Sequence, residues 1–456
     1  MPASEAPPTG SDDLLSYTDQ LLFLGQRATG QELVMQCVWV YDRAVDLAGV
    51  RRFHERYGHG LMGRRIEPSP LWFGRHRWVA APGPEAELEV ADTRPRPELA
   101  DWVDECAQAP IDPEHGPVWR LAVLPMTDGA TAVSLVISHC VSDGIGALTT
   151  IAAAADGAVH HFDYPAPGSR TRWQALRSDL RQTARDLPEV GRTLRTAARM
   201  AMARRHEIGA SKPPRMDLPP DARQNVVVPS VTVHVDIAEW DSRAAELGGN
   251  NHSLVAGFAA KLAERMGRRR PADGAVTLQL PISDRQPGDT RANAALLAYA
   301  AVDPENVTTD LADVRSAIRQ AFAEVRDVPD ETLQLLPLTP YVPKTAVRRG
   351  SDVVFGLADL PVSCSNLGDV PPAVARVDGT EADYVMLRGV DRKVDRGFLE
   401  RRRGLLTVLA GRIAGRVSLV VVAYLPGGSF DRDDLRALVG KTLDEFALSG
   451  VMDFAT

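Results

Sequence analysis

The sequence predicts an α/β protein built from two halves that are joined by a helical connector. Apolar runs of strand length alternate with segments of helical apolar spacing over most of the 456 residues. A chain of this length is too long for one small core and long enough for two domains of ordinary size. Between residues 165 and 224 the pattern changes to arginine-rich helical spacing bounded by prolines. We therefore expect one half in residues 1–164 and the other in residues 225–456.

Composition excludes several classes of protein. Charged residues at 25% and hydrophobic residues at 44% are globular values, and a net charge of -8 argues against a protein dedicated to nucleic acid. Residues 1–13 lack the apolar run of a signal peptide, and no apolar stretch is long enough to span a bilayer, so any membrane contact should be peripheral. The four cysteines show no spacing typical of disulfide scaffolds or zinc sites, which indicates a cytoplasmic protein: Cys37, Cys106, Cys140 and Cys364.

The first half is expected to contain three helices and three strands. Ser16 is a plausible start for the first helix, and Gly144 opens the last one. In order, these elements are a helix over 14–26, a strand over 32–41, a helix over 45–59, a strand following Trp119, a turn at 127–129, a buried strand over 133–137 and a helix over 145–155.

Residues 138–144 (Ser-His-Cys-Val-Ser-Asp-Gly) are the main candidate for chemistry, because they place a titratable group where a buried strand stops. Alternate side chains of a strand share a face, so His139 should point with Ile137, while Ser138 and Cys140 point the other way. Apolar surroundings favour the neutral imidazole, which can accept a proton. Taken alone, the same pattern is also typical of a buried core histidine before a turn.

The connector over residues 165–224 predicts two helical segments, the second of which follows Pro188. Its outer face is rich in arginine. Such a face is usually just solvated, and the alternative is docking to an anionic lipid surface or to an acidic carrier protein. The arginines concerned are Arg172, Arg177, Arg181, Arg185, Arg192, Arg195, Arg199, Arg204 and Arg205.

The second half repeats the alternation of strands and helices. The residues at 248–253 should cap its longer helix. The expected elements are a strand over 226–237, helices over 241–247 and 254–266, strands over 276–280 and 293–302, two strands within 404–426 that are joined by a turn at 411–415, and an amphipathic helix that begins near residue 431.

Several short motifs resemble those of one enzyme superfamily. His139, Asp143 and Gly144 resemble the His-His-x-x-x-Asp-Gly signature of the condensation-domain and chloramphenicol-acetyltransferase-like superfamily, although Ser138 replaces the first His. The segment 117–119 (Pro-Val-Trp) is similar to a motif of the wax ester synthase and diacylglycerol acyltransferase branch. Further similarities follow in the family's order and extend the resemblance over about residues 14–448: Arg285 with Asn293, and Ser365, Asn366 and Gly368.

The resemblance implies a fold and a set of site residues. Two acetyltransferase-like halves should pack as a V with a central channel. The family's second His is its catalytic base, which implies that role for His139, whereas Asp143 should be structural and form an ion pair with Arg285. The remaining positions near the substrate would be Gly144, Ser365 and Asn366. No metal is implied, and no cofactor beyond an acyl-CoA or phosphopantetheine-bound acyl thioester that serves as co-substrate.

The implied activity is transfer of an acyl group from such a thioester to a hydroxyl, which forms an ester in lipid or polyketide biosynthesis. The acceptor would be a small-molecule or lipid alcohol, and an acyl or peptidyl carrier protein is a candidate partner. Two alternatives stay open. One is amide-forming condensation of the nonribosomal peptide type with a carrier protein. The other is a non-catalytic member that binds a ligand or a carrier. This alternative stays open because Ser138 replaces the first His of the signature.

Overall fold

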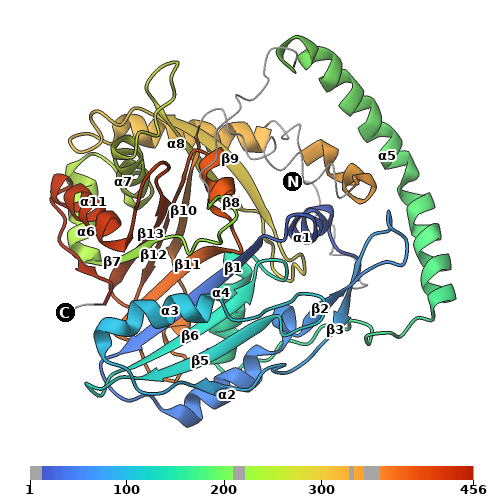
Figure 1. Ribbon diagram of the computed structural model, residues 1–456, viewed down its shortest axis with the longest axis horizontal. Coiled ribbons are helices and arrows are strands. Elements are labelled where there is room, and N and C mark those ends of the chain that lie inside the picture. Colours follow the sequence, from blue (N-terminus) through green and yellow to red (C-terminus); the bar gives the residue numbers. More distant parts are fainter. Residues whose placement is uncertain (1–12, 209–220, 328–332, 344–359, 455–456) are drawn as a thin grey trace, which may run out of the picture.

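The computed structural model describes residues 13–208, 221–327, 333–343 and 360–454 (Figure 1). The predicted lack of an apolar leader falls on residues 1–12, and the prolines that end the connector fall on residues 209–220; both lie outside the described residues. The described chain forms two β-sheets with helices packed around them. The predicted α/β class with two sheet-rich parts is therefore confirmed.

The first sheet has five strands in the order β11-β1-β6-β5-β4, all antiparallel except for the β4-β5 pair. Its strands are β11 (Tyr384–Arg392), β1 (Glu32–Tyr41), β6 (Thr131–Ser138), β5 (Trp119–Pro125) and β4 (Glu89–Val90). The helices of this half are α1 (Tyr17–Thr29), α2 (Leu47–Tyr57), α3 (Leu99–Ala107), α4 (Gly144–Ala155), η1 (Gly60–Met62) and η2 (Arg96–Glu98), and a separate hairpin comprises β2 (Arg64–Glu67) and β3 (Arg77–Ala80).

The second sheet has seven strands in the order β14-β7-β13-β12-β10-β8-β9, in which β12, β10 and β8 run parallel. The strands are β14 (Val451–Met452), β7 (Ser230–Asp236), β13 (Arg416–Tyr424), β12 (Leu405–Ile413), β10 (Val362–Asp369), β8 (Val276–Ser283) and β9 (Ala295–Val302). The helices are α6 (Ile237–Glu246), α7 (Asn251–Arg265), α8 (Ala312–Asp327), α10 (Arg396–Arg401), α11 (Arg432–Glu445), η3 (Leu333–Tyr341) and η4 (Pro372–Ala375). Helix α7 lies at the centre of this half's core, where Leu254, Phe258 and Leu262 are fully buried.

Strand β11 connects the two halves. It comes from the second half of the sequence but pairs along its whole length with β1, with Val385 opposite Trp39 and Asp391 opposite Leu33. A further core lies between the sheets, where Met386 of β11 packs with Val420 and other residues of β13. The first sheet is thus completed by residues from beyond position 225, while the domain boundaries proposed from the sequence stay predictions.

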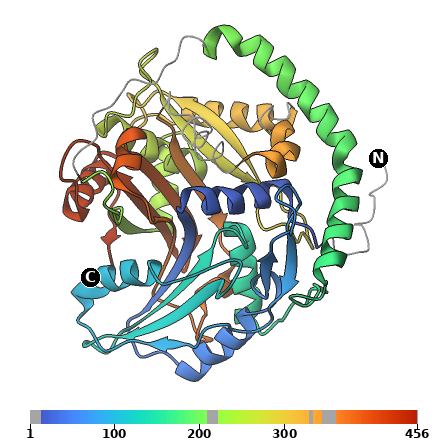
Figure 2. The same cartoon turned by 45° about the vertical axis from the view of Figure 1, so that its right-hand side comes forward.

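Helix α5 (Arg172–Ile208) contradicts the predicted break at Pro188, because it continues through that proline. A proline in a helix removes one backbone hydrogen bond and usually ends or kinks the helix. Here Pro188 is exposed, and Val190 and Thr193 beyond it are buried again. Burial of the following turn holds the helix together past the proline. The helix arches along the outside of the molecule (Figures 1 and 2).

Strand β8 is longer than predicted and includes Pro281. Beyond Gln279 it has no pairing with β10, and Pro281 pairs only with Leu297 of β9 on its other side. A proline is tolerated where a strand has a free edge, because no partner needs its missing N–H group. The extension carries the chain to Ser283, two residues before Arg285. None of the described helices is both long and apolar enough to cross a membrane.

Candidate active site

His139 lies directly after the end of β6, in a turn that is held from two sides. Its backbone N–H donates to the carbonyl of Leu33 on β1 at 3.1 Å. Its own carbonyl accepts from Nδ2 of Asn293, in the loop between β8 and β9, at 3.2 Å. One neighbour belongs to the first half and the other to the second. The position of His139 therefore depends on contact between the halves.

The predicted alternation of side chains fails after Ser138. Cys140 packs into the same core as Ile137 and donates its thiol to Oε1 of Gln26 at 2.9 Å. The reason is that β6 ends at Ser138 and the chain turns, with the N–H of Val141 donating to the carbonyl of Ser138 at 3.1 Å. Burial raises the pKa of the Cys140 thiol to about 12, so the thiol stays protonated at neutral pH.

The imidazole of His139 is neutral at neutral pH and has an unengaged nitrogen. Burial lowers the pKa of the ring, and the backbone of His139 itself, the carboxylates of Asp143 and Asp19, and the side chain of Asn293 only partly oppose that effect. Nδ1 is buried and has no hydrogen-bond partner among the described residues, although the side chain as a whole is partly exposed. A neutral imidazole on a partly exposed residue can accept a proton from a bound molecule.

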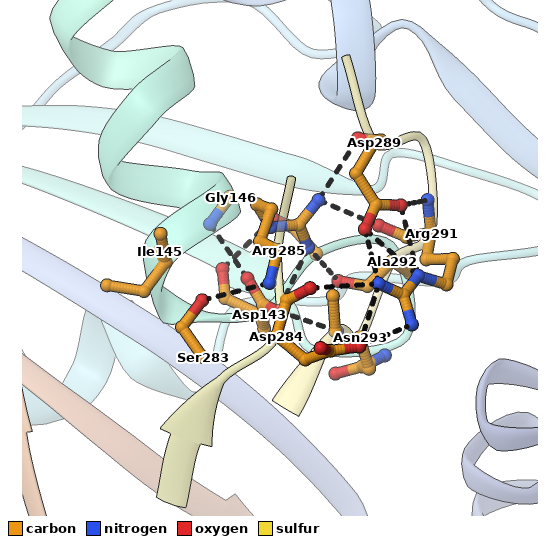
Figure 3. A network of polar contacts seen from close by, with 12 residues as sticks. Asp143, Ile145, Gly146, Ser283, Asp284, Arg285, Asp289, Arg291, Ala292 and Asn293 are labelled. Carbon is orange, nitrogen blue, oxygen red and sulfur yellow. Dashed lines mark hydrogen bonds and ion pairs between the residues drawn. The ribbon is translucent and has the colours of Figure 1, made fainter. Parts of the chain in front are cut away.

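Asp143 caps helix α4 and meets Arg285, so the predicted contact between these residues is present (Figure 3). Its Oδ1 accepts from the N–H of Gly146 at 2.7 Å. Its Oδ2 accepts from the N–H of Ala294 at 2.8 Å and lies 2.9 Å from Nη2 of Arg285. The two side chains are only 10% and 9% exposed. Because both carboxylate oxygens are engaged in these contacts, Asp143 has a structural role and no oxygen is free to accept a proton from a bound molecule.

Arg285 also shapes the loop that follows it. Its Nη1 donates to the carbonyls of Asp289 at 3.2 Å and Arg291 at 3.0 Å, and its Nη2 donates to that of Ala292 at 2.9 Å (Figure 3). The carbonyl of Ala292 also accepts from the backbone N–H of Asp143 at 2.7 Å. Arg285 thus folds the loop between β8 and β9 against the turn after His139.

Asp19 on α1 is a site residue that the sequence did not reveal. It is fully buried, and its carboxylate accepts from three donors: the N–H of Ala292 at 3.1 Å, the N–H of Asn293 at 2.8 Å and Nδ2 of Asn293 at 3.0 Å. Because Nδ2 of Asn293 also reaches the carbonyl of His139, Asp19 positions that contact. An acidic residue three positions after the helix cap Ser16 is ordinary in a first turn, so its special place gave no signal.

Arg64 is a second buried cation that sequence reasoning missed. Its Nη2 donates to the carbonyl of Val141 at 2.9 Å, and its Nη1 donates to the Tyr164 hydroxyl at 2.7 Å and to the carbonyl of Thr290 at 2.5 Å. The guanidinium lies 3.8 Å from the centroid of the Trp78 ring. Burial lowers the pKa of Arg64, although a guanidinium keeps its charge in proteins. Arg64 and Arg285 therefore hold the same turn and loop from two directions.

Asp391 on β11 lies near His139 and also escaped the sequence reasoning. It is paired with Leu33, the residue whose carbonyl receives the N–H of His139. Burial raises the pKa of this carboxyl, while Arg402 and His139 act to lower it. Since β11 was not expected in the first sheet, no pattern pointed to a carboxyl at this place.

The three predicted substrate-binding residues do not share one surface. Gly144 opens α4 next to Leu367, whose Cδ2 would lie 3.6 Å from a Cβ atom on Gly144. Ser365 is paired with Leu409, which packs against the first half's core, so it shares the face turned toward that half. Asn366 is paired with Ala410, which belongs to the second half's core, and therefore faces away.

Asn366 instead borders a cavity of about 160 Å³ in the second half. Its Oδ1 accepts from the N–H of Gly368 at 2.9 Å, while its buried Nδ2 has no partner among the described residues. The cavity thus borders the face of β10 opposite to Ser365. Its other lining residues are His252, Leu280, Pro281, Ile282, Ser283, Ile318, Phe322 and Cys364.

Comparison with known proteins agrees with the superfamily predicted from the sequence. Residues 61–231 match the family model of the wax ester synthase/diacylglycerol acyltransferase catalytic domain, and this segment includes the whole stretch 138–144. The resemblance to that branch is therefore confirmed over this part of the chain. No curated protein sequence matches the chain significantly.

Solved structures share the fold. The wax ester synthase/diacylglycerol acyltransferase from Marinobacter aquaeolei VT8 is 15% identical, with 95% of this chain and 98% of that chain covered and a TM-score of 0.54. The first condensation domain of the calcium-dependent antibiotic synthetase, in complex with a substrate analogue, is 14% identical, with 95% of each chain covered and a TM-score of 0.57. The nonribosomal peptide synthetase FmoA3 is 20% identical, with a TM-score of 0.52. The match covers 98% of this chain but 44% of the synthetase, so this chain spans less than half the length of FmoA3.

Proposed function

We propose that the chain is an acyltransferase that moves an acyl group from a thioester, on CoA or on a carrier protein, to a hydroxyl acceptor. The observation that carries this proposal is the place of His139, a partly exposed residue with a neutral imidazole in a turn fixed by both halves. The match of residues 61–231 to an acyltransferase catalytic domain supports it independently.

His139 acts as the general base in this proposal. It takes the proton of the acceptor hydroxyl while that oxygen attacks the thioester carbon, and it returns the proton to the thiolate that leaves when the carbon–sulfur bond breaks. The lowered pKa keeps the ring ready to accept a proton at neutral pH. Asp143 does not compete for the proton, since Arg285 and two backbone N–H groups engage its oxygens. The chemistry uses no metal.

Amide formation is the second candidate, and the similarity of fold to a condensation domain favours it. The same base could serve an amine acceptor, so the two reactions differ in the acceptor rather than in the role of His139. An ester is preferred because the family match is to the wax ester synthase branch.

The test incubates the purified protein with acyl-CoAs of several chain lengths and a panel of alcohols and amines, followed by mass spectrometry of the products. An ester that disappears in His139→Ala is the expected result. An amide would shift the proposal to condensation, and absence of any product with both CoA and carrier donors would favour a binding protein.

Cys140→Ala is the matched control and should keep turnover, because the Cys140 thiol is protonated and packed in the core. An acyl group trapped on Cys140 would contradict direct transfer.

A further inference from the structure

Helix α5 is a fixed structure with one face in solvent. Its 37 residues span about 55 Å at 1.5 Å per residue, along the outside of the molecule (Figures 1 and 2). The inner face is anchored: Asp179 accepts from the Ser69 hydroxyl at 2.6 Å, Arg170 reaches Asp179 at 2.6 Å, and Val190 is buried. The outer face is therefore held at a set orientation relative to the body of the protein.

An apolar stripe runs along this outer face. Trp173, Leu180, Leu187 and Leu194 follow one another at intervals of seven residues, close to two turns of a helix, so they lie nearly in one line. Trp173 is 80% exposed, and the three leucines are each about half exposed. A continuous exposed apolar patch of this kind marks an interaction surface more often than chance exposure.

A ladder of arginines runs along one flank of the stripe. At 3.6 residues per turn, the six fall within an arc of about 80°. Among the residues of α5 whose side chains the structure describes, Glu189 is the only exposed acidic one, and no carboxylate of the described residues forms an ion pair with any of the six arginines. This positive surface stands out on a chain with a net charge of -8. The ladder comprises Arg177, Arg181, Arg185, Arg192, Arg195 and Arg199.

We propose that the outer face of α5 docks the protein on the surface of an anionic lipid bilayer. The apolar stripe would enter the boundary between headgroups and acyl chains, and the arginines would extend to the lipid phosphates while their stems cover apolar surface. Tryptophan suits this boundary because one edge is apolar and the other polar. Charge complementarity favours a lipid bilayer as the partner. The apolar stripe matches the acyl chains, and the unpaired arginines beside it match the anionic headgroups.

A second copy of the chain fits this face less well. Two α5 helices packed through their leucines would bring two arginine ladders together, with Glu189 as the one exposed acid among the described side chains of each helix to offset the repulsion. An acidic protein would neutralise the ladder but would not require an apolar stripe that extends from Trp173 to Leu194 beside it. The proposal does not depend on acyl transfer, and the test below uses no acyl donor.

The test is flotation of the purified full chain with vesicles of phosphatidylglycerol and phosphatidylcholine in equal parts, beside vesicles of phosphatidylcholine alone. Binding to the anionic vesicles is expected and should fall steeply as salt is added. Arg192→Glu with Arg195→Glu should weaken that binding by more than about tenfold, since each cation near such a surface contributes substantially. Leu180→Ser with Leu187→Ser should weaken it at every salt concentration.

The matched control reverses two exposed arginines on another helix, Arg315→Glu with Arg319→Glu on α8, which changes the net charge equally. This control should float as the unaltered chain does, and thermal melting should show all variants folded. Failure of the unaltered chain to float, or equal loss in the α8 control, would overturn the proposal. So would a dimer in solution that Leu187→Ser disrupts while vesicles have no effect, or binding of acidic proteins without binding of vesicles.

Discussion

At the scale of single residues, the proposed chemistry depends on an imidazole whose residue is fixed through its backbone. The N–H and carbonyl of His139 are both hydrogen-bonded, whereas Nδ1 has no partner among the described residues. Because Nδ1 has no partner and the two backbone hydrogen bonds do not involve the ring, removal of the ring should cost little stability. Stability and activity should therefore respond differently to changes at this position.

His139→Ala is expected to slow turnover by roughly 10²- to 10⁴-fold, the usual contribution of a general base. The melting temperature should stay close to that of the unaltered chain, since both backbone hydrogen bonds of residue 139 remain when the ring is removed and Nδ1 has no partner to lose. Steady-state kinetics with the preferred donor, together with a thermal melt followed by circular dichroism, measures both. Normal turnover in a folded His139→Ala protein would remove His139 from the mechanism.

The pH dependence follows from the lowered pKa of His139. A base works in its unprotonated form, so kcat/KM should be level at neutral pH and fall on the acid side, with an apparent pKa below the value of about 6.5 for an ordinary histidine. The same sign holds for stability: the unfolded chain binds the proton more readily, so this contribution is present above about pH 6.5 and is lost as the pH falls through the folded pKa. A kcat/KM profile with an acid limb above pH 7 would contradict a buried neutral base.

The sequence predicted the site unevenly, for physical reasons. The contact of Asp143 with Arg285 was expected from family motifs, because each residue ends a recognisable segment. Ser365 and Asn366 were expected together because they are adjacent in sequence, but neighbours on a strand face opposite ways, and β10 separates them. Asp19 could not be found at all, since only the tertiary fold brings α1 to the loop at 285–294.

At the scale of elements, the site is a set of loops held by strand ends and helix caps. Segments with an uninterrupted apolar run or a clear cap were predicted well: β1 has its expected bounds, and α4 begins at Gly144. Strand β11 was missed because its sequence, Tyr-Val-Met-Leu-Arg-Gly-Val-Asp-Arg, mixes apolar and charged residues. Its central Arg388 is buried only because Gln36 and Asp104 receive its guanidinium, which sequence alone does not show.

Loss of Asp19 should loosen the loop between β8 and β9. Asp19→Ala leaves three buried donors on Ala292 and Asn293 without their acceptor, and each unsatisfied group costs about 1 to 3 kcal/mol. We expect a lower free energy of unfolding and slower turnover, since Asn293 then supports the carbonyl of His139 less firmly.

The control for Asp19 is Asp46→Ala, which removes the cap of α2 at an exposed position and should cost only about 1 kcal/mol. Urea denaturation measures both losses. Equal losses in the two variants, with full turnover in Asp19→Ala, would show that Asp19 is an ordinary first-turn acid.

At the scale of the whole molecule, three of the features that join the two halves differ in extent. Strand β11 completes the first sheet, a shared core packs Met386 against Val420, and the ion pair of Asp143 with Arg285 ties the turn after His139 to the second half. The first two are extended and mainly apolar. The ion pair is local, so its loss can be tested by a single substitution.

Asp143→Ala should therefore harm both stability and rate. Removing one member of a buried pair leaves the other charge uncompensated, at a cost on the order of 3 to 5 kcal/mol in the free energy of unfolding. Asp143→Asn separates this effect from loss of the helix cap, because its amide oxygen can still accept from the N–H of Gly146 while its charge is gone. Most of the loss should persist in Asp143→Asn.

Asp241→Ala, which breaks a more exposed pair with Arg412, should cost no more than about 1 kcal/mol. If urea denaturation gives the same small loss for Asp143→Asn as for Asp241→Ala, and turnover is unchanged, the ion pair does not hold the turn of His139 in place.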